Sequence, residues 1–232
     1  MNILVITGSP KGEKSDTSKV TRAFLNGMGE EAKWIEACHA NVGYCNGCFK
    51  CWSETPGKCV QNDGMTQIID DFTHADLVIW STPQYAYGMP GPLKTVLDRL
   101  LPLSLPDQKT DENGKTNQIR RVPFPKQMLI SGCGFADMHL NCEPLLMQFE
   151  FFFGKDYPYI YCAQAPLLAY RSAYALTEPY IKAVEHAGKE FAETGKISPQ
   201  TQKKLNSTMV PSDIYRRMVN LSVKTGHFGS KV

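Results

Sequence analysis

Ile3-Leu4-Val5-Ile6-Thr7-Gly8-Ser9-Pro10 is the stretch that decides the fold of this chain. Its apolar and β-branched residues at 3–6 are typical of a parallel-sheet strand that is covered on both faces. The residues at 8–10 then break the strand. A helical pattern follows, with one apolar face made of Val20, Phe24, Leu25 and Met28. A buried strand that leads through a short turn into a helix predicts the start of a βαβ unit.

The same alternation continues along the chain. Short apolar runs predict further strands at residues 34–35, 77–80, 128–130 and 159–162. Apolar residues at helical spacing predict helices within residues 65–72, 93–100, 140–153 and 180–191. Together these elements predict an α/β fold, a three-layer doubly wound sheet of five parallel strands in the flavodoxin-like order 2-1-3-4-5.

Composition excludes several classes of protein. Hydrophobic residues make up 42% of the 232 residues and charged residues 21%, which is enough apolar material for a buried core. With 25 basic and 23 acidic residues the net charge is +2, so there is no electrostatic basis for binding nucleic acid or a membrane surface. The first residues lack the basic region of a signal peptide, and no apolar run is long enough to span a bilayer. We therefore expect a cytoplasmic protein with reduced thiols.

Two parts of the chain are expected to be additions to one domain. Residues 1–196 should form the domain, with an exposed, polar and proline-rich excursion at 101–123. Residues 197–232 contain only short amphipathic pieces and should form a C-terminal helical extension. The simplest role for both additions is self-association, which predicts a homodimer or tetramer.

The first candidate site is the turn at residues 7–18. Small residues and the free N–H groups at the start of the following helix favour an anion, and a phosphate monoester fits this chemistry. An ordinary polar turn, capped by Ser15 or Asp16, is the alternative. The side chains that would bind the phosphate are Ser9, Lys11, Ser15, Thr17 and Ser18.

Two further turns follow the third and fourth predicted strands, and the carboxyl ends of parallel strands meet at one sheet edge. In the first of them, Tyr85 and Tyr87 suit a flat heteroaromatic ring, and Gly88 permits close backbone approach. A proline-rich turn with surface tyrosines is the alternative. In the second, the glycines of Gly132-Cys133-Gly134 let the backbone approach a ligand closely, and Cys133 is expected to be a buried small residue.

Four cysteines lie in one short run, Cys45, Cys48, Cys51 and Cys59. Thiolates at C-x2-C-x2-C spacing can converge on one point, as the ligands of iron–sulfur clusters do. The same residues could equally be thiols that bind nothing. A zinc site is disfavoured because two separated C-x2-C pairs are missing.

In combination these motifs resemble the flavodoxin-like NAD(P)H-dependent FMN reductase family, including its iron–sulfur flavoprotein branch. The resemblance covers roughly the first two-thirds of the chain, and the three motifs in this order are specific. The matching segments are Gly8-Ser9-Pro10-Lys11 with Ser15-Asp16-Thr17, the run 45–59 leading to Asp63-Gly64-Met65, and Pro83-Gln84-Tyr85 with residues 93–99.

The resemblance implies FMN, with its phosphate in the first turn and its ring against the other two. Its phosphate ligands would be the five side chains named above. Many relatives have Asn where this chain has Asp16, and we expect this carboxylate to turn outward as a helix cap. The resemblance places the ring and ribityl chain against Pro83, Gln84, Tyr85, Tyr87, Gly88, Gly132, Cys133 and Gly134.

The expected activity is that of an NAD(P)H-dependent FMN reductase-like oxidoreductase. Hydride would pass from NADH or NADPH to FMN, and electrons would leave to a small-molecule or protein acceptor, with no catalytic side chain required. One alternative is an iron–sulfur flavoprotein with a [4Fe-4S] cluster on the four cysteines of the run. Another is a non-catalytic FMN-binding carrier or regulatory module, but carriers of this kind are acidic and this chain has a pI of about 8.1.

Overall fold

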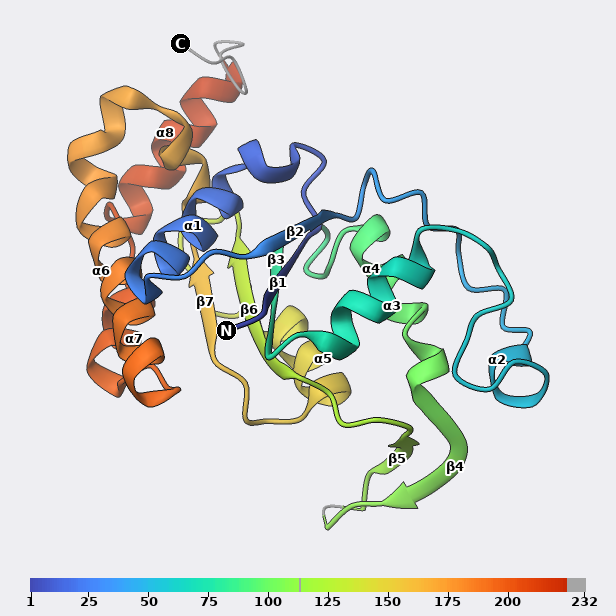
Figure 1. Ribbon diagram of the computed structural model, residues 1–232. Coiled ribbons are helices and arrows are strands. Elements are labelled where there is room, and N and C mark those ends of the chain that lie inside the picture. The colour runs from blue at the N-terminus through green and yellow to red at the C-terminus, as the bar shows by residue number, and fades with distance from the viewer. Residues whose placement is uncertain (113, 225–232) are drawn as a thin grey trace.

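Five parallel strands form the centre of the fold, and the computed structural model describes residues 1–112 and 114–224. The strands lie in the order β2-β1-β3-β6-β7 (Figure 1), which confirms the predicted order 2-1-3-4-5 when the parallel strands are counted alone. Each strand includes the apolar run that predicted it. Their bounds are β1 Ile3–Thr7, β2 Lys33–Glu36, β3 Leu77–Pro83, β6 Lys126–Gly132 and β7 Tyr159–Cys162.

Each predicted helix is present, and together the helices cover both faces of the sheet (Figure 1). Three pack on one face: α1 (Asp16–Met28), α6 (Tyr174–Thr194) and α7 (Pro199–Leu205). Three pack on the other: α3 (Met65–His74), α4 (Gly91–Asp98) and α5 (Glu143–Phe153). The remaining helical elements are α2 (Lys50–Ser53), α8 (Ser212–Lys224), η1 (Gly12–Lys14), η2 (Leu101–Leu103), η3 (Ala165–Ala169) and η4 (Arg171–Ala173).

Alternate residues of each strand belong to different cores, because successive side chains point to opposite faces of a sheet. On β1, Ile3 and Val5 pack under α1 and α6, whereas Leu4 and Ile6 pack under α3, α4 and α5. Helices α1 and α6 approach very closely at a glycine. A β-carbon on Gly188 would lie 2.1 Å from the carbonyl oxygen of Phe24, so a larger residue would force these helices apart.

The excursion predicted at 101–123 forms an antiparallel hairpin of β4 (Ser104–Thr110) and β5 (Thr116–Arg120) that projects from the domain (Figure 1). Its regular structure was not expected, and residues 102–104 at its base are buried. At its base the Arg120 guanidinium lies 4.1 Å from the Phe124 ring centroid and 4.7 Å from that of Phe152. Burial between these rings lowers the pKa of Arg120.

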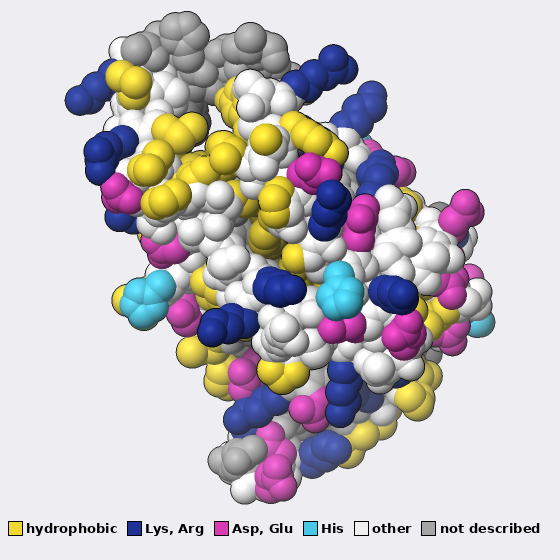
Figure 2. Space-filling model, turned by 90° about the vertical axis from the view of Figure 1, so that its left-hand side faces the viewer, with side chains coloured by type: hydrophobic (Ala, Val, Ile, Leu, Met, Phe, Trp, Pro, Cys, Tyr) yellow, Lys and Arg dark blue, Asp and Glu magenta, His cyan; other side chains and the backbone are white. Residues whose placement is uncertain are grey.

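Helices α7 and α8 form the described part of the predicted C-terminal extension, whose residues 225–232 lie outside the described range. The Glu190 carboxylate of α6 holds α7 in place by accepting hydrogen bonds from Ser198 and Thr201. Over the face that bears these helices, acidic and basic side chains are interspersed (Figure 2), in keeping with the small net charge. Within residues 1–112 and 114–224, no helix has the length and apolar character needed to cross a membrane.

Candidate functional site

Four segments that are far apart in the sequence line one cavity of about 180 Å³ at the carboxyl edge of the sheet. They follow β1, β3, β6 and β7, and we call them the first, second, third and fourth loops. Of the thirteen residues predicted to bind a cofactor, ten line this cavity, and Ser18, Tyr87 and Gly88 do not. The full lining is Ser9, Lys11, Ser15, Asp16, Thr17, Pro83, Gln84, Tyr85, Gly132, Cys133, Gly134, Ala165 and Pro166.

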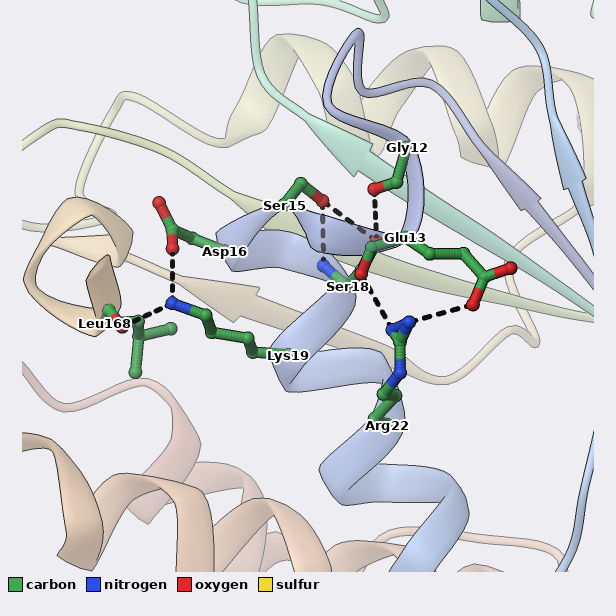
Figure 3. A network of polar contacts seen from close by, with 8 residues as sticks. All are labelled: Gly12, Glu13, Ser15, Asp16, Ser18, Lys19, Arg22 and Leu168. Atoms are coloured by element: carbon green, nitrogen blue, oxygen red, sulfur yellow. Dashed lines mark hydrogen bonds and ion pairs between the residues drawn. The ribbon is translucent and has the colours of Figure 1, made fainter. Parts of the chain in front are cut away.

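The first loop is held by hydroxyl groups at the start of α1 (Figure 3). Ser15 is the N-cap, and its Oγ accepts a hydrogen bond of 3.1 Å from the backbone N–H of Ser18. The Ser18 hydroxyl donates to the carbonyl of Gly12 at 3.0 Å, so it shapes the loop from inside. The first N–H groups of a helix have no intrahelical acceptor. Those of Asp16 and Thr17 are therefore the donors that this helix offers to an anion.

Asp16 does not cap the helix, so the expected cap role is wrong; Ser15 has that role. The Asp16 carboxylate instead lies 2.9 Å from Lys19 Nζ, which also donates to the carbonyl of Leu168 at 2.6 Å (Figure 3). Pairing with Lys19 offsets the negative charge that would otherwise repel a phosphate at this helix end. Lys19, one helical turn along α1, thus compensates for the charge that Asp16 adds where many relatives have asparagine.

Glu36 fixes the outer side of the first loop. Its Oε1 accepts a hydrogen bond of 2.9 Å from the backbone N–H of Glu13, and its Oε2 lies 2.7 Å from His39 Nδ1. These two hydrogen bonds, that from Glu13 first, lower the pKa of Glu36. Gly12 has a φ of +53°, and a β-carbon there would lie 1.9 Å from Glu36 Oε1. Only glycine therefore fits at this point of the loop.

The second loop is a tight hairpin. Tyr85 and Gly88 exchange backbone hydrogen bonds of 3.0 and 2.9 Å. The two residues between them, Ala86 and Tyr87, have φ values of +47° and +62°. Non-glycine residues in this conformation store strain, and such strain is common at ligand sites. The Tyr87 ring stacks on Phe135 of the third loop, with centroids 5.4 Å apart, whereas Tyr85 lines the cavity.

Gln84 joins the second and third loops from beneath. Its backbone N–H donates to the carbonyl of Gly132 at 2.9 Å, and its Nε2 donates to the carbonyl of Asn141 at 2.6 Å. Its Oε1 accepts a short hydrogen bond from the Tyr161 hydroxyl. Burial raises the pKa of Tyr161, which therefore remains a donor. Because both ends of the Gln84 amide are engaged, this side chain supports the cavity wall.

Gly132 brings the third loop directly against its neighbours. A β-carbon there would lie 2.8 Å from Thr17 Oγ1 and 3.0 Å from the β-carbon of Ala165, so the glycine is needed for this packing. The next residue, Cys133, is only 5% exposed, and burial raises the pKa of its thiol. A protonated, buried thiol is a poor nucleophile, in agreement with the structural role expected for Cys133.

The four cysteines of the run gather around a separate and much smaller cavity of about 20 Å³, the cysteine cavity. Cys51 is buried, Cys59 is half-buried, and Cys45 and Cys48 are exposed. The pKa of Cys51 is raised by burial and further by the charges of the other three thiols, so the four are electrostatic neighbours. Across the described ranges, however, no three Cys, His, Asp or Glu side chains converge closely enough to form a metal site.

Arg99 and Asp63 close the base of this cysteine loop. Two guanidinium nitrogens of Arg99 lie 2.8 and 2.9 Å from the two carboxylate oxygens of Asp63, and Arg99 Nη1 also donates to the carbonyl of Gly43 at 2.7 Å. Partial burial opposes ionisation of Asp63, but hydrogen bonds from Arg99 and from backbone N–H groups outweigh it and lower its pKa. Arg99 also lines the cysteine cavity and interacts with Cys59.

Residues 1–116 match the family described as NADPH-dependent FMN reductase, which is half of the chain. This chain belongs to that family. Among curated relatives of this reductase family member are iron–sulfur flavoproteins. One from Methanocaldococcus jannaschii is 32% identical over 117 residues, 49% of this chain and 59% of the relative. One from Archaeoglobus fulgidus is 31% identical over 105 residues, 44% and 46% of the two chains. The matches thus span about half the length of these relatives.

Solved structures of the same fold include reductases that differ widely in sequence. An FMN-dependent NADH-azoreductase from Bacillus anthracis, solved with FMN, has a TM-score of 0.58 at 19% identity and covers 83% of this chain and 100% of its own. An NAD(P)H:quinone oxidoreductase from Methanothermobacter marburgensis has a TM-score of 0.59 at 14% identity, covering 82% and 96%. At these identities the likeness confirms the flavodoxin-like fold of this family member.

The cavity of this reductase family member fits FMN in its donor chemistry. Hydroxyl groups, Lys11 and the N-terminus of α1 line it and offer the donors that a phosphate needs. The side chain of Tyr85 and the glycine backbone at 132–134 line it as well and allow the close approach that a flat ring needs. Ala165 and Pro166 were missed from the sequence, although they follow the predicted strand at 159–162. The rule that ligands bind at carboxyl ends of strands, applied to this last strand, could have identified them.

Proposed function

We propose that this protein is an FMN-dependent oxidoreductase that takes hydride from NAD(P)H and passes electrons to a small-molecule or protein acceptor. The observation that carries the proposal is the convergence of four separate loops on one cavity, whose lining combines a helix N-terminus with the aromatic side chain of Tyr85. The family to which the chain belongs supports it. Bound FMN would supply the acceptance of hydride and the release of electrons.

The chain's own residues would bind and orient the reactants. Thr17 and the N-terminus of α1 would bind the phosphate, and Ser15 would hold this helix end in place, because its hydroxyl donates to Ser18 Oγ at 2.9 Å. Tyr85 would cover one side of the ring. Gly88 cannot donate its backbone N–H to the flavin, because that group is bonded to the carbonyl of Tyr85 at 2.9 Å. The backbone of Gly134, which is exposed and lines the cavity, is the better candidate for stabilising negative charge on a reduced ring.

Two measurements test the proposal. FMN should bind the purified protein with quenching of flavin fluorescence, at one FMN per chain. The loaded protein should then oxidise NADH or NADPH in the presence of a quinone, a nitro-compound or ferricyanide. A protein that binds no FMN would overturn the proposal, and one that binds FMN but oxidises neither donor with any acceptor would instead be a carrier.

An iron–sulfur flavoprotein is a second candidate function, favoured by the gathering of four thiols and Arg99 around one small cavity. The names of the curated relatives support it. The donor chemistry fits a [4Fe-4S] cluster, but the described thiols are not assembled in cluster geometry. Cluster binding would therefore require the exposed Cys45 and Cys48 to move inward. No step of the proposed reaction depends on it.

Iron and acid-labile sulfide, measured after anaerobic purification, test this candidate. Four iron atoms per chain and a broad visible shoulder, both lost in Cys48→Ser, would support it. Lys58→Ala changes an exposed residue of the same loop and should keep the iron. Iron content that is substoichiometric in the wild type, or unchanged in Cys48→Ser, would exclude the cluster.

We also propose a cytoplasmic homodimer or tetramer. A groove of about 620 Å³ between α4, α5 and the hairpin supports self-association, because its lining includes Met147, Phe151 and Phe152. Met147 and Phe151 are both more than half exposed, at 57% and 58%. If this groove is buried between subunits, light scattering should give a lower mass for Phe151→Glu than for the wild type.

A further inference from the structure

A second cavity, of about 310 Å³, lies between the third loop and α8. This second cavity adjoins the candidate FMN site, since Gly134 lines both cavities. Family members share the first loops, but α8 lies beyond the segment that matches the family. The polar and aromatic side chains that line the second cavity are Phe135, Asp137, Asn141, Tyr215, Arg216 and Asn220.

Helix α8 is built onto the third loop by buried contacts. Gln164 is fully buried, and its Nε2 donates to the carbonyls of Ala136 and Val210 at 2.7 and 2.9 Å. Its Oε1 accepts from the backbone N–H of Val210 at 3.0 Å. Tyr215, on the first turns of α8, is only 4% exposed and packs in a cluster with Ala136. The second cavity is therefore held in fixed register with the site.

Arg216 supplies positive charge at this cavity. Its side chain is 58% exposed, and its Nη1 lies 3.5 Å from Asp137 Oδ2, which is long for an ion pair. A guanidinium carries five N–H donors in a planar fork that matches phosphate, so this contact leaves donors for a ligand. The neighbouring Arg217 is engaged differently, because it pairs with Asp213 at 2.5 Å and does not line the cavity.

We propose that the second cavity binds the nucleotide half of the NAD(P)H donor, with Arg216 on a phosphate and Asp137 on a ribose hydroxyl. This inference rests on the proposed function. Hydride transfer requires the nicotinamide to reach the flavin ring at the first cavity, which bound FMN would already occupy. The rest of the donor must therefore lie on a surface next to this cavity. The cavity that shares Gly134 with it offers a guanidinium and a carboxylate, and these groups suit a phosphate and a hydroxyl.

The test compares Arg216→Ala with Arg217→Ala in the FMN-loaded protein. The Kd of NADP⁺ is measured by calorimetry, and the KM of NADPH and of NADH by donor oxidation. Arg216→Ala should raise the Kd and KM about tenfold or more, because it removes a charge-assisted hydrogen bond. Arg217→Ala and the FMN Kd should change less than about twofold, and Arg216→Lys should restore part of the affinity. An effect on NADPH alone indicates the 2′-phosphate, and an equal effect on both donors indicates the pyrophosphate.

Other outcomes overturn the inference. It fails if Arg216→Ala binds NADP⁺ like the wild type, or if both arginine variants weaken binding equally. It also fails if Arg216→Ala raises only the KM of the acceptor, which would make the cavity an acceptor site. A wild type that binds neither FMN nor NADP⁺ would refute the proposed function itself. A wild type that binds both, with Arg216→Ala unchanged, would refute this inference alone.

Discussion

Arg99 and Asp63 form a two-pronged ion pair, with contacts of 2.8 and 2.9 Å, beneath the cysteine loop. Arg99 is only 1% exposed and Asp63 14%, so this pair is largely shielded from water. It joins the C-terminal end of α4 to residues on both sides of the loop. The pair therefore holds the loop in place whether or not the cysteines bind a cluster.

Asp63→Asn should lower the free energy of unfolding by about 3–5 kcal/mol, because it leaves the buried Arg99 without its counter-charge. Urea unfolding measures this. Asp98→Asn is the control, since its partner Lys94 is exposed and such pairs contribute at most about 1 kcal/mol. Equal stability of the Asp63 variant and the wild type would refute the structural role of the pair.

The same pair predicts a pH dependence. The pKa of Asp63 is lowered in the folded protein. The contribution of the pair to the free energy of unfolding is therefore fully present above the unfolded-state pKa of about 3.9. It is lost as the pH falls through the lower folded-state pKa. The free energies of unfolding of Asp63→Asn and of the wild type, measured by urea unfolding at several pH values, should therefore converge in acid and differ more toward neutral pH. A constant difference between them would contradict this.

Gly132→Ala should weaken FMN binding about tenfold or more and also lower the Tm. The added methyl would lie 2.8 Å from Thr17 Oγ1 and 3.0 Å from the β-carbon of Ala165, which pushes the first and fourth loops apart. Fluorescence titration with FMN and thermal unfolding measure the two effects. Gly91→Ala is the matched control, because a β-carbon there meets nothing within 4 Å. Unchanged FMN affinity in Gly132→Ala would show that the loops can separate freely.

Ser15→Ala should cost about 1 kcal/mol of stability, the usual loss for a helix N-cap, and should also weaken FMN binding. Ser198→Ala removes the N-cap of α7, which accepts from the backbone N–H of Thr201 at 3.2 Å, far from the cavity. The two variants should lose similar stability in urea unfolding. Only Ser15→Ala should raise the Kd of FMN, and a similar Kd in both variants would remove Ser15 from the phosphate site.

Tyr85→Ala should lower kcat/KM for the acceptor about tenfold and change the FMN Kd less than about threefold. Its ring is 51% exposed at the cavity mouth, where it can shape the space above the flavin more than it binds the flavin. Steady-state kinetics with two acceptors of different size measure this. Tyr44→Ala, at a tyrosine that is 79% exposed and outside the cavity, should leave both quantities unchanged. Equal loss of FMN affinity and acceptor kinetics would refute this role.

The order of the sheet followed from the sequence because each parallel strand is an apolar run, as residues 77–80 illustrate. The first three loops could be found because they follow such runs directly. The hairpin at 104–120 could not be predicted, since its strands are largely polar and pair only with each other. The role of Gln84 also escaped prediction. Its amide is held by Tyr161 and Asn141, which are 77 and 57 residues away in the sequence.

The geometry of the cysteine loop could not be predicted for a different reason. The spacing of its cysteines indicated that they could converge, and they do line one cavity. Whether they reach cluster geometry depends on the backbone between them, which the spacing does not determine. The placement of α8 had no signal at all, because it depends on Gln164, a buried polar residue that lies just after the last predicted strand.

The buried amide of Gln164 also sets an order of events during synthesis. Its partners at Ala136 and Val210 are separated by many residues, and Tyr215 completes the packing around them. The third loop can therefore take its final form only after the ribosome has made the chain beyond Tyr215. A nascent chain that stalls before this point would expose an incomplete pocket, so cofactor loading should follow translation.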